Sequence, residues 1–185
     1  METDLNTIRV IAKTKKKQNM AFRRFLKLRN AEEIDKLVHT LYQKVASSID
    51  CMVCANCCKE LQVLVDIDDI DKLSQALRIS VRQFTMRYVT RDAEEPNLWV
   101  FKNNPCPFLQ HNCCLLYTHR PQRCISYPHL QKEQFTERLL TVLEHYDICP
   151  IVFNVCECLK TETGFNSGSR RDIVDYSCLK PPKST

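Results

Sequence analysis

Four cysteines lie within eight residues of this chain, in the stretch CMVCANCCKE at residues 51–60. They are Cys51, Cys54, Cys57 and Cys58. Two successive gaps of two residues allow one tight loop to direct several sulfurs at one ion, as in zinc sites and iron–sulfur clusters. Because adjacent cysteines point their side chains apart, we expect that Cys57 and Cys58 do not share one mononuclear ion. One of the two would then bridge two metals, serve a second site or act as a redox thiol.

A second group of cysteines follows about fifty residues later. It consists of Cys106, Cys113, Cys114, Cys124 and, further on, Cys149. Their spacing is looser than in the first group, so buried and inert thiols are a stronger alternative explanation here. We expect the two groups to converge on one core and to supply the same metal site or sites.

The choice between metal binding and disulfides depends on the cellular compartment. Of the 185 residues, 44% are hydrophobic and 26% are charged, which is the profile of one ordinary soluble domain. No apolar run approaches the roughly 18 residues of a membrane span, and the N-terminus lacks the apolar core and cleavage site of a secretory signal. We therefore expect a cytoplasmic protein, in which the 12 cysteines stay reduced and serve metal or redox chemistry.

Hydrophobic periodicity and capping signals predict a mainly α-helical α+β domain, stapled by metal and carrying one or two short hairpins. We expect a basic, partly helical N-terminal extension at 1–29, a cysteine-cluster metal-binding domain at 30–162 and a polar C-terminal tail at 163–185. Helices are predicted at 30–50, 66–77, from 80 up to the Glu-Glu-Pro at 94–96, at 131–147 and at 150–162, with a short helical turn that has Pro121 at its first position. Strands are predicted at 61–65 and 97–101, and a tight hairpin or loop pair at 106–117.

The basic stretch at residues 13–29 raises the question of nucleic-acid binding. Its charges surround a few apolar residues such as Phe22 and Leu26, but the net charge of the chain is only +5 and no nucleic-acid-binding motif accompanies it. We therefore expect a solvated arm whose apolar residues dock on the domain, and no nucleic-acid partner. Glycine occurs only at 164 and 168, which excludes glycine-rich nucleotide-binding loops.

Several motifs between Cys51 and Pro150 occur in the same order as in a family of cysteine-cluster proteins, which the chain resembles. The family has the signature C-x2-C-x2-C-C, is called CxxCxxCC, and is described as "putative zinc- or iron-chelating" domains. After the first cysteine block, a middle pattern of the family is matched by Asp69, Ile70, Leu73, Ser80, Phe84, Arg87 and Tyr88. A second block is matched by Cys106, Phe108, Leu109, Cys114, Tyr117, Arg120, Pro121, Cys124, Tyr127 and Pro128, and Cys149-Pro150 closes the set. The chain departs from the pattern at Asn56, Leu116 and Ile125, which concern loop shape and local charge and not the cysteines.

The resemblance implies chelation of zinc or iron by eight thiols. These are Cys51, Cys54, Cys57, Cys58, Cys106, Cys114, Cys124 and Cys149. Eight thiols fit two all-thiolate zinc sites, or an iron–sulfur cluster of three or four cysteines with spare thiols. Cys113 stays ambiguous, helical periodicity predicts that Cys156 belongs to the core, and Cys158 and Cys178 are expected to be incidental thiols.

Two classes of function remain. In the first, the chain is a metal-chelating protein whose two cysteine blocks converge on one or two zinc or iron sites. In the alternative, it is a component of an iron- or iron–sulfur-dependent redox or protein-modifying enzyme, since flagellin lysine N-methylases carry the same cysteine signature in longer chains. The lack of a recognisable substrate-binding motif favours the first class. The expected partner is the metal ion, the sequence identifies no protein partner, and Arg120 is expected to offset the charge of nearby thiolates.

Overall fold

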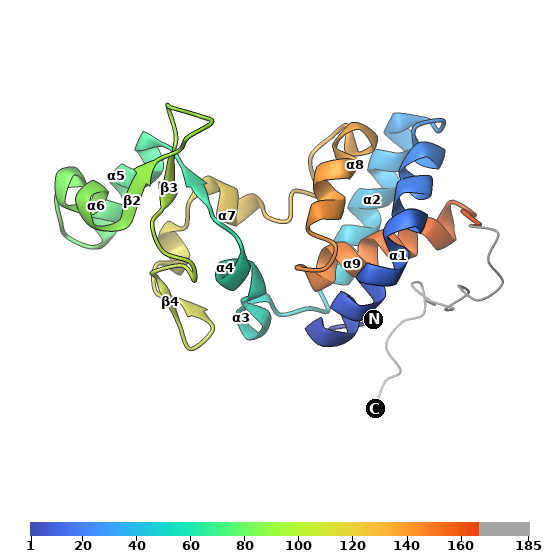
Figure 1. Cartoon of the computed structure of the whole chain (residues 1–185), viewed down its shortest axis with the longest axis horizontal. Coiled ribbons are helices and arrows are strands. Elements are labelled where there is room, and N and C mark those ends of the chain that lie inside the picture. Colours follow the sequence, from blue (N-terminus) through green and yellow to red (C-terminus); the bar gives the residue numbers. More distant parts are fainter. Residues whose placement is uncertain (167–185) are drawn as a thin grey trace. The chain divides into compact units, whose positions relative to one another are not determined.

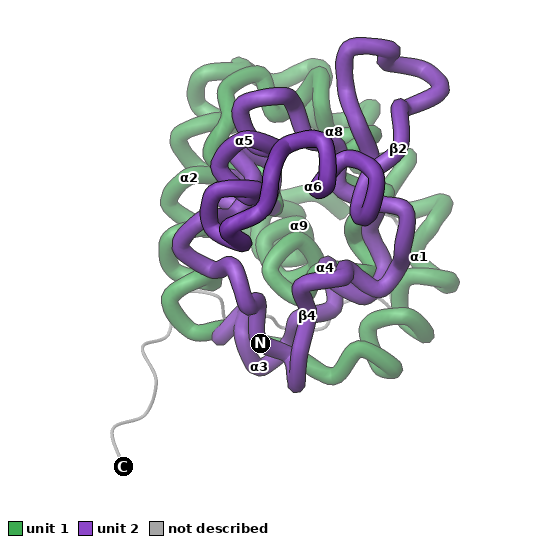
Figure 2. Tube along the Cα trace, turned by 90° about the vertical axis from the view of Figure 1, so that its left-hand side faces the viewer, with its two compact units in different colours: residues 1–49, 128–185 green, residues 50–127 purple. Residues whose placement is uncertain are grey.

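The computed structural model describes residues 1–166 of the chain and divides the chain into two compact units (Figure 2). Unit 1 is formed by residues 1–49 together with the segment that begins at Pro128, and unit 2 is formed by residues 50–127. These boundaries fall at other positions than the expected divisions after residues 29 and 162, which rested on composition and not on contacts. Within the described part, no helix is long and apolar enough to cross a membrane.

Unit 1 is a helical bundle organised around α9 (Figure 1). This helix, Pro150–Glu162, starts at the predicted residue and is buried continuously from Pro150 to Lys160. Two further helices, α2 (Ala31–Ala46) and α1 (Leu5–Leu26), each pack against both α9 and α8 (Phe135–Glu144). A helix that is buried all round is a core element, so α9 supplies the centre of this unit.

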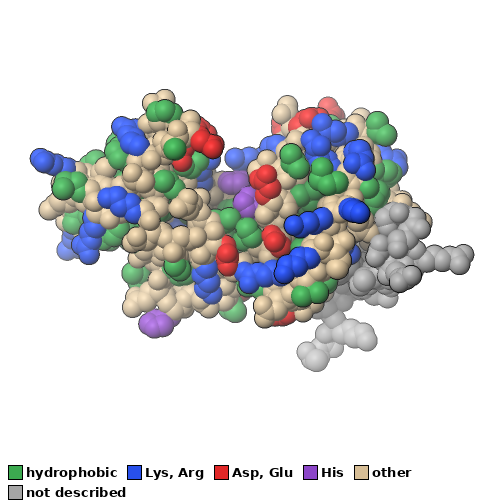
Figure 3. Space-filling view, viewed as in Figure 1, with side chains coloured by type: hydrophobic (Ala, Val, Ile, Leu, Met, Phe, Trp, Pro, Cys, Tyr) green, Lys and Arg blue, Asp and Glu red, His purple; other side chains and the backbone are tan. Residues whose placement is uncertain are grey.

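The N-terminal helix α1 is an integral layer of unit 1 and not a solvated arm, although apolar residues such as Phe22 and Leu26 are buried against the unit as predicted. Its buried side includes Ile8, Phe22 and Leu26, which are fully inaccessible to solvent. The basic residues Lys13 and Lys17 lie on the exposed side, and lysine and arginine side chains are frequent on the face of unit 1 shown in Figure 3. Apart from the buried Lys15, the lysines of α1 are therefore exposed, whereas its large apolar residues Ile8, Phe22 and Leu26 are buried.

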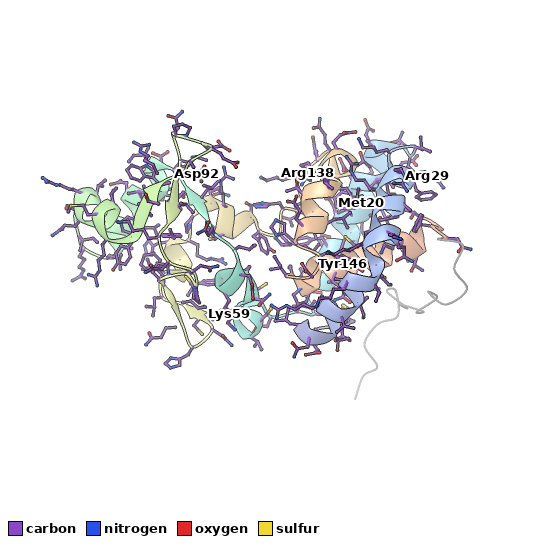
Figure 4. The ribbon with its side chains drawn as sticks, viewed as in Figure 1. Met20, Arg29, Lys59, Asp92, Arg138 and Tyr146 are labelled. Carbon is purple, nitrogen blue, oxygen red and sulfur yellow. The ribbon has the colours of Figure 1, made fainter. Side chains whose placement is uncertain are left out.

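A polar network crosses the core of unit 1. It explains why apolar periodicity did not identify the buried side of α1, which includes polar residues. The Glu157 carboxylate of α9 accepts hydrogen bonds from Lys15, from Lys160 at 2.5 Å and from the Tyr146 hydroxyl at 2.5 Å. Lys160 also donates to Asn19 of α1 at 2.5 Å. Lys15 and Asn19 occupy the buried stripe of α1, and Tyr146 lies among the helices of the bundle (Figure 4). The buried charges are tolerated because each is paired and hydrogen-bonded.

Unit 2 combines a helix pair with a small antiparallel sheet. The helices are α5 (Ile67–Ala76) and α6 (Val81–Tyr88), which pack against each other. The sheet has the order β1-β3-β2, with β1 at Leu64–Val65, β2 at Val89–Arg91 and β3 at Trp99–Phe101. In its register Val65 is opposite Trp99, and Thr90 is opposite Val100.

Aromatic side chains hold the core of unit 2 together. The Phe108 ring lies 5.0 Å from the Tyr88 ring, 5.6 Å from Phe101 and 6.1 Å from Phe84, measured between ring centroids. Val65 and Ile70 are fully buried in the same cluster. Since Phe108 directly follows the Cys106-Pro107 pair, this core anchors one end of the second cysteine block.

The predicted fold class is confirmed: the described chain is mainly helical, with short strands in two small sheets. Several helix starts are also confirmed, because Asn30 and Asp66 cap α2 and α5 with their side chains and Ser80 forms a reciprocal capping box with Gln83. Other details were wrong. The helix from Ser80 ends at Tyr88 and the next three residues form β2, which is too short to carry a periodic signal. Helix α8 starts four residues later than expected.

Candidate metal centre

The first cysteine block folds as two short helical turns. The first turn, α3 (Cys51–Cys54), begins at Asp50, whose side chain accepts the backbone N–H of Met52 at 2.8 Å. Ala55 then takes a left-handed conformation with φ of 48°, and α4 (Asn56–Glu60) follows at once. This break in the helix places two cysteines on each turn of one compact loop.

The second block is a two-stranded hairpin followed by a short helix. Strands β4 (Leu109–Gln110) and β5 (Cys113–Cys114) pair so that Leu109 is opposite Cys114, which confirms the predicted hairpin. The turn residues His111 and Asn112 both have positive φ, as in the tight turns that suit the twist of a hairpin. Cys124 lies on α7 (Gln122–Ser126), for which Pro121 is the N-cap residue and not the first helical residue as predicted.

Two hydrogen bonds join the blocks directly. The backbone N–H of Cys106 donates to the carbonyl oxygen of Cys58 at 2.8 Å. The side-chain amide of Asn112 donates to the carbonyl oxygen of Val53 at 3.2 Å. Cysteines about fifty positions apart in the sequence are therefore brought together within unit 2, as the sequence predicted.

The thiols of the two blocks influence one another electrostatically. Burial raises the pKa of Cys106 to about 11, and the neighbouring Cys58 and Cys114 add to the shift. Burial raises the pKa of Cys124 to about 12, again with contributions from Cys58, Cys106 and Cys114. Cys106 and Cys124 are harder to ionise mainly because they are buried, and the like charge of neighbouring thiolates adds to this effect. A bound cation would remove this obstacle, since thiolates are the form that binds metal.

Cys57 and Cys58 do not point apart as expected. A hydrogen bond between their side chains lowers the pKa of Cys58 to about 7, with the positive charges of Arg120 and Lys59 acting in the same direction and burial opposing them. The α4 turn is compact enough to bring adjacent thiols into contact, so adjacency alone does not separate these two sulfurs.

Arg120 brings a positive charge to the cluster, as predicted. Its guanidinium carbon lies 3.7 Å from the centre of the Tyr117 ring, and its Nε donates to the Tyr117 carbonyl oxygen at 3.0 Å. Its charge lowers the pKa of thiols from both blocks, among them Cys51 and Cys114, against the larger effect of their burial. A fixed guanidinium at this place favours the thiolate forms.

One positioning residue was not recognised as such from the sequence. The Asp69 carboxylate on α5 accepts the backbone N–H of Gln122, the first residue of α7, at 3.1 Å. Asp69 is only 4% exposed, although its neighbours Asp68 and Asp71 belong to the same acidic run. The family pattern includes Asp69, but neither the pattern nor the charge of this acidic stretch predicted that its carboxylate is buried against α7.

The predicted site residues are divided between the two units. Seven of them, Cys51, Cys54, Cys57, Cys58, Cys106, Cys114 and Cys124, belong to unit 2. Cys149 belongs to unit 1, where it is buried and precedes α9 as its N-cap residue. Cys113 is exposed on β5, and Cys156 is fully buried in α9 as predicted. Cys158 is disulfide-bonded and therefore not an incidental thiol, while Cys178 lies outside the described residues.

The cysteine thiols of unit 2 are chemically suited to bind zinc or iron. Their sulfur atoms, however, are not arranged as a closed coordination shell. Thiolates are preferred ligands of zinc and of iron–sulfur clusters. Across residues 1–166, however, no three side chains of His, Cys, Asp or Glu are grouped closely enough to hold an ion. Binding would therefore draw the sulfurs of the two blocks closer together.

Fold and site together define unit 2 as a small cysteine-rich domain with paired cysteine blocks. Residues 50–141 match the family model CxxCxxCC, described as "Putative zinc- or iron-chelating domain", and this part of the chain belongs to that family. The matched range ends before Cys149. Neither the curated proteins nor the solved structures contain a significant match to the chain.

Proposed function

We propose that the chain chelates zinc or iron through the thiolates of its two cysteine blocks, which together supply one or two metal sites. The observation that carries this proposal is the direct link between the blocks, in which the Cys106 N–H binds the Cys58 carbonyl oxygen. This link keeps the cysteines of the hairpin next to those of α3 and α4. The proposal requires reduced thiols, as in the cytoplasm.

Seven candidate ligands come from unit 2, and Cys149 is an eighth. In the absence of a cation, burial and mutual repulsion raise the pKa of thiols such as Cys106 and Cys124. Metal binding would displace their protons and convert the repulsion into attraction. Arg120 would offset part of the negative charge that several thiolates leave. Bound zinc would act structurally in a closed thiolate shell, whereas iron would add redox chemistry.

The ligand assignment is tested by replacing Cys54 or Cys57 with serine, which keeps the size of the side chain but weakens metal binding. We expect lower metal content and a lower melting temperature of unit 2 in both variants, because ligation and folding are coupled in such sites. Cys113→Ser is the matched control, because Cys113 is exposed and adjacent to a predicted ligand. Unchanged metal content and melting in both Cys54→Ser and Cys57→Ser would contradict the assignment.

A further inference from the structure

The outer side of α1 carries positive charge without negative charge. The helix contains seven lysines and arginines, and neither aspartate nor glutamate. Lys13, Lys16, Lys17 and Arg24 are exposed, whereas Lys15 belongs to the buried side of the helix. One sign of charge on one side of a helix creates a local positive potential, which the modest net charge of +5 for the whole chain does not reveal.

The exposed basic residues form a continuous row with one methionine among them. The row, which we call the basic stripe, consists of Lys13, Lys16, Lys17, Met20, Arg24 and Lys27. Each member is three or four residues away from another member, and residues at these spacings are neighbours on the surface of a helix. At a rise of about 1.5 Å per residue, the basic stripe extends about 21 Å along the helix axis.

Most of the charge of the basic stripe is uncompensated within the part of the chain that the structure describes. Lys27 forms an ion pair with Glu137 of α8 at 3.5 Å. Among the described residues, no ion pair joins the side chain of Lys13, Lys17 or Arg24 to an acidic group. The basic stripe is therefore complementary in charge to an anionic partner.

Exposed apolar side chains indicate which kind of anionic partner fits. Met20 of the basic stripe is 39% exposed, Val10 three residues before Lys13 is 64% exposed, and Leu28 just beyond the helix is 87% exposed. Basic residues mixed with exposed apolar ones suit an anionic lipid surface, because charge attracts the helix to the headgroups and apolar side chains enter the boundary with the acyl chains. The phosphates of a nucleic acid are contacted by charged and polar groups, which leaves these apolar side chains without a role.

We infer that the outer side of α1 docks on an anionic lipid surface. The basic side chains of the stripe bind the charged headgroups, and Val10 and Met20 enter the headgroup layer beside them. The helix lies along the membrane surface, since the basic stripe follows its axis. Unit 1 stays folded, because the opposite side of α1 keeps its contacts with α8 and α9. This docking surface is separate from the cysteine blocks and does not depend on metal binding.

Cosedimentation of the whole chain with lipid vesicles tests the inference. The vesicles contain phosphatidylcholine and phosphatidylserine in a ratio of three to one, and vesicles of phosphatidylcholine alone are the uncharged reference. We expect binding to the anionic vesicles and not to the reference. Binding should be lost when the salt concentration rises from about 0.05 M to about 0.5 M, because salt screens exposed charges.

A variant of the basic stripe combines Lys13→Gln, Lys17→Gln and Arg24→Gln. It should bind the anionic vesicles about 100-fold more weakly, since each basic residue near such a surface contributes about fivefold to the affinity. Glutamine suits exposed positions of a helix, so the circular dichroism and melting temperature of the variant should match those of the native chain.

The matched control removes the same number of charges from other helices. It combines Lys36→Gln on α2, Lys72→Gln on α5 and Arg82→Gln on α6, all of which are exposed positions. Its affinity for the anionic vesicles should change by less than about threefold, because charges away from the docking surface are screened.

A third variant, Val10→Gln with Met20→Gln, leaves the net charge unchanged. It should bind the anionic vesicles about fivefold more weakly, because it loses apolar side chains that enter the headgroup layer. Vesicle binding that this variant does not weaken would overturn the lipid assignment. So would a native chain that binds duplex DNA more tightly than the anionic vesicles at the same salt concentration.

The remaining outcomes decide whether the basic stripe is a docking surface at all. A native chain that does not bind the anionic vesicles, or that binds the uncharged vesicles equally well, would overturn the inference. Equal weakening in the stripe variant and in the matched control would also overturn it, because binding would then follow net charge and not the outer side of α1.

Discussion

The Asp69 carboxylate accepts the backbone N–H of Gln122 at 3.1 Å and thereby ties α5 to the first residue of α7. Cys124 lies two residues further along that short helix. A helix of five residues, Gln122–Ser126, has little intrinsic stability, so an external acceptor for its first N–H group contributes to its position. Asp69 therefore helps to hold one cysteine of the second block in place without being a ligand.

Replacing Asp69 with alanine should destabilise unit 2 by about 1–2 kcal/mol, the usual effect of losing a helix-capping acceptor. Zinc or iron affinity should fall as well, because α7 and Cys124 lose a fixed position. Asp68→Ala is the control, since Asp68 is exposed in the same acidic run and should change stability by less than about 0.5 kcal/mol. Urea unfolding followed by the fluorescence of Trp99, the only tryptophan, measures the stability of both variants. Equal effects of the two substitutions would contradict the role of Asp69.

The pH dependence of stability offers a second test of Asp69. Burial raises the pKa of Asp69 above the ordinary value of an aspartate side chain, and the Gln122 N–H opposes this shift only in part. A carboxyl group with a raised pKa in the folded state contributes stability below its unfolded pKa, and this stability is lost as the pH rises through the folded pKa. Asp69→Asn keeps an acceptor oxygen without the charge. We therefore expect the stability of Asp69→Asn relative to the native chain to increase between about pH 4 and pH 7. If the stability of Asp69→Asn relative to the native chain falls over this range, the folded state favours the charged form of Asp69, which would contradict the prediction.

The buried network of unit 1 predicts a large effect for Glu157→Gln. This substitution leaves the ammonium groups of Lys15 and Lys160 without their buried counter-charge, at a cost of about 3–5 kcal/mol. Glu162→Gln is a matched control on the same helix, because Glu162 is exposed and the change should stay within about 0.5 kcal/mol. Urea unfolding followed by far-ultraviolet circular dichroism measures both variants. A loss below about 1 kcal/mol for Glu157→Gln would mean that the two lysines find other partners or lose their protons.

Removal of the metal should affect the two units differently. Trp99 lies on β3 of unit 2, whereas the long helices of unit 1 dominate the far-ultraviolet signal. With a chelator present, we expect the thermal transition seen by Trp99 fluorescence to shift to lower temperature, because unit 2 contains seven of the eight candidate ligands. The helical signal of unit 1, which contributes only Cys149, should shift less. A chelator that shifts neither transition would mean that the metal does not stabilise unit 2.

Local signals made a large part of the fold predictable. The capping residues Asn30, Asp66 and Ser80 were recognised because their side chains bind backbone N–H groups a few positions away. Pro150 was recognised as the start of α9 because proline suits the first helical position. In each case the interaction that determines the boundary lies within one turn of the chain.

Features that depend on distant partners were missed. The buried stripe of α1 contains Lys15 and Asn19, which only the contacts with α9 reveal as core residues. Likewise, the family pattern includes Asp69, but its role as an acceptor for the Gln122 N–H depends on the placement of α7 beside α5. The side-chain interaction between the adjacent Cys57 and Cys58 was also not predicted from their spacing.

The most direct test of metal chelation by unit 2 is elemental analysis, with a visible spectrum, of protein purified without oxygen or an affinity metal. We predict at least about one zinc or iron per native chain, and its loss when Cys51, Cys54, Cys57 and Cys58 are all replaced with serine. Colourless protein would identify zinc, whereas iron with sulfide and broad visible absorption would identify an iron–sulfur cluster. A native chain free of both metals, or an equal metal content in the fourfold variant, would contradict the account.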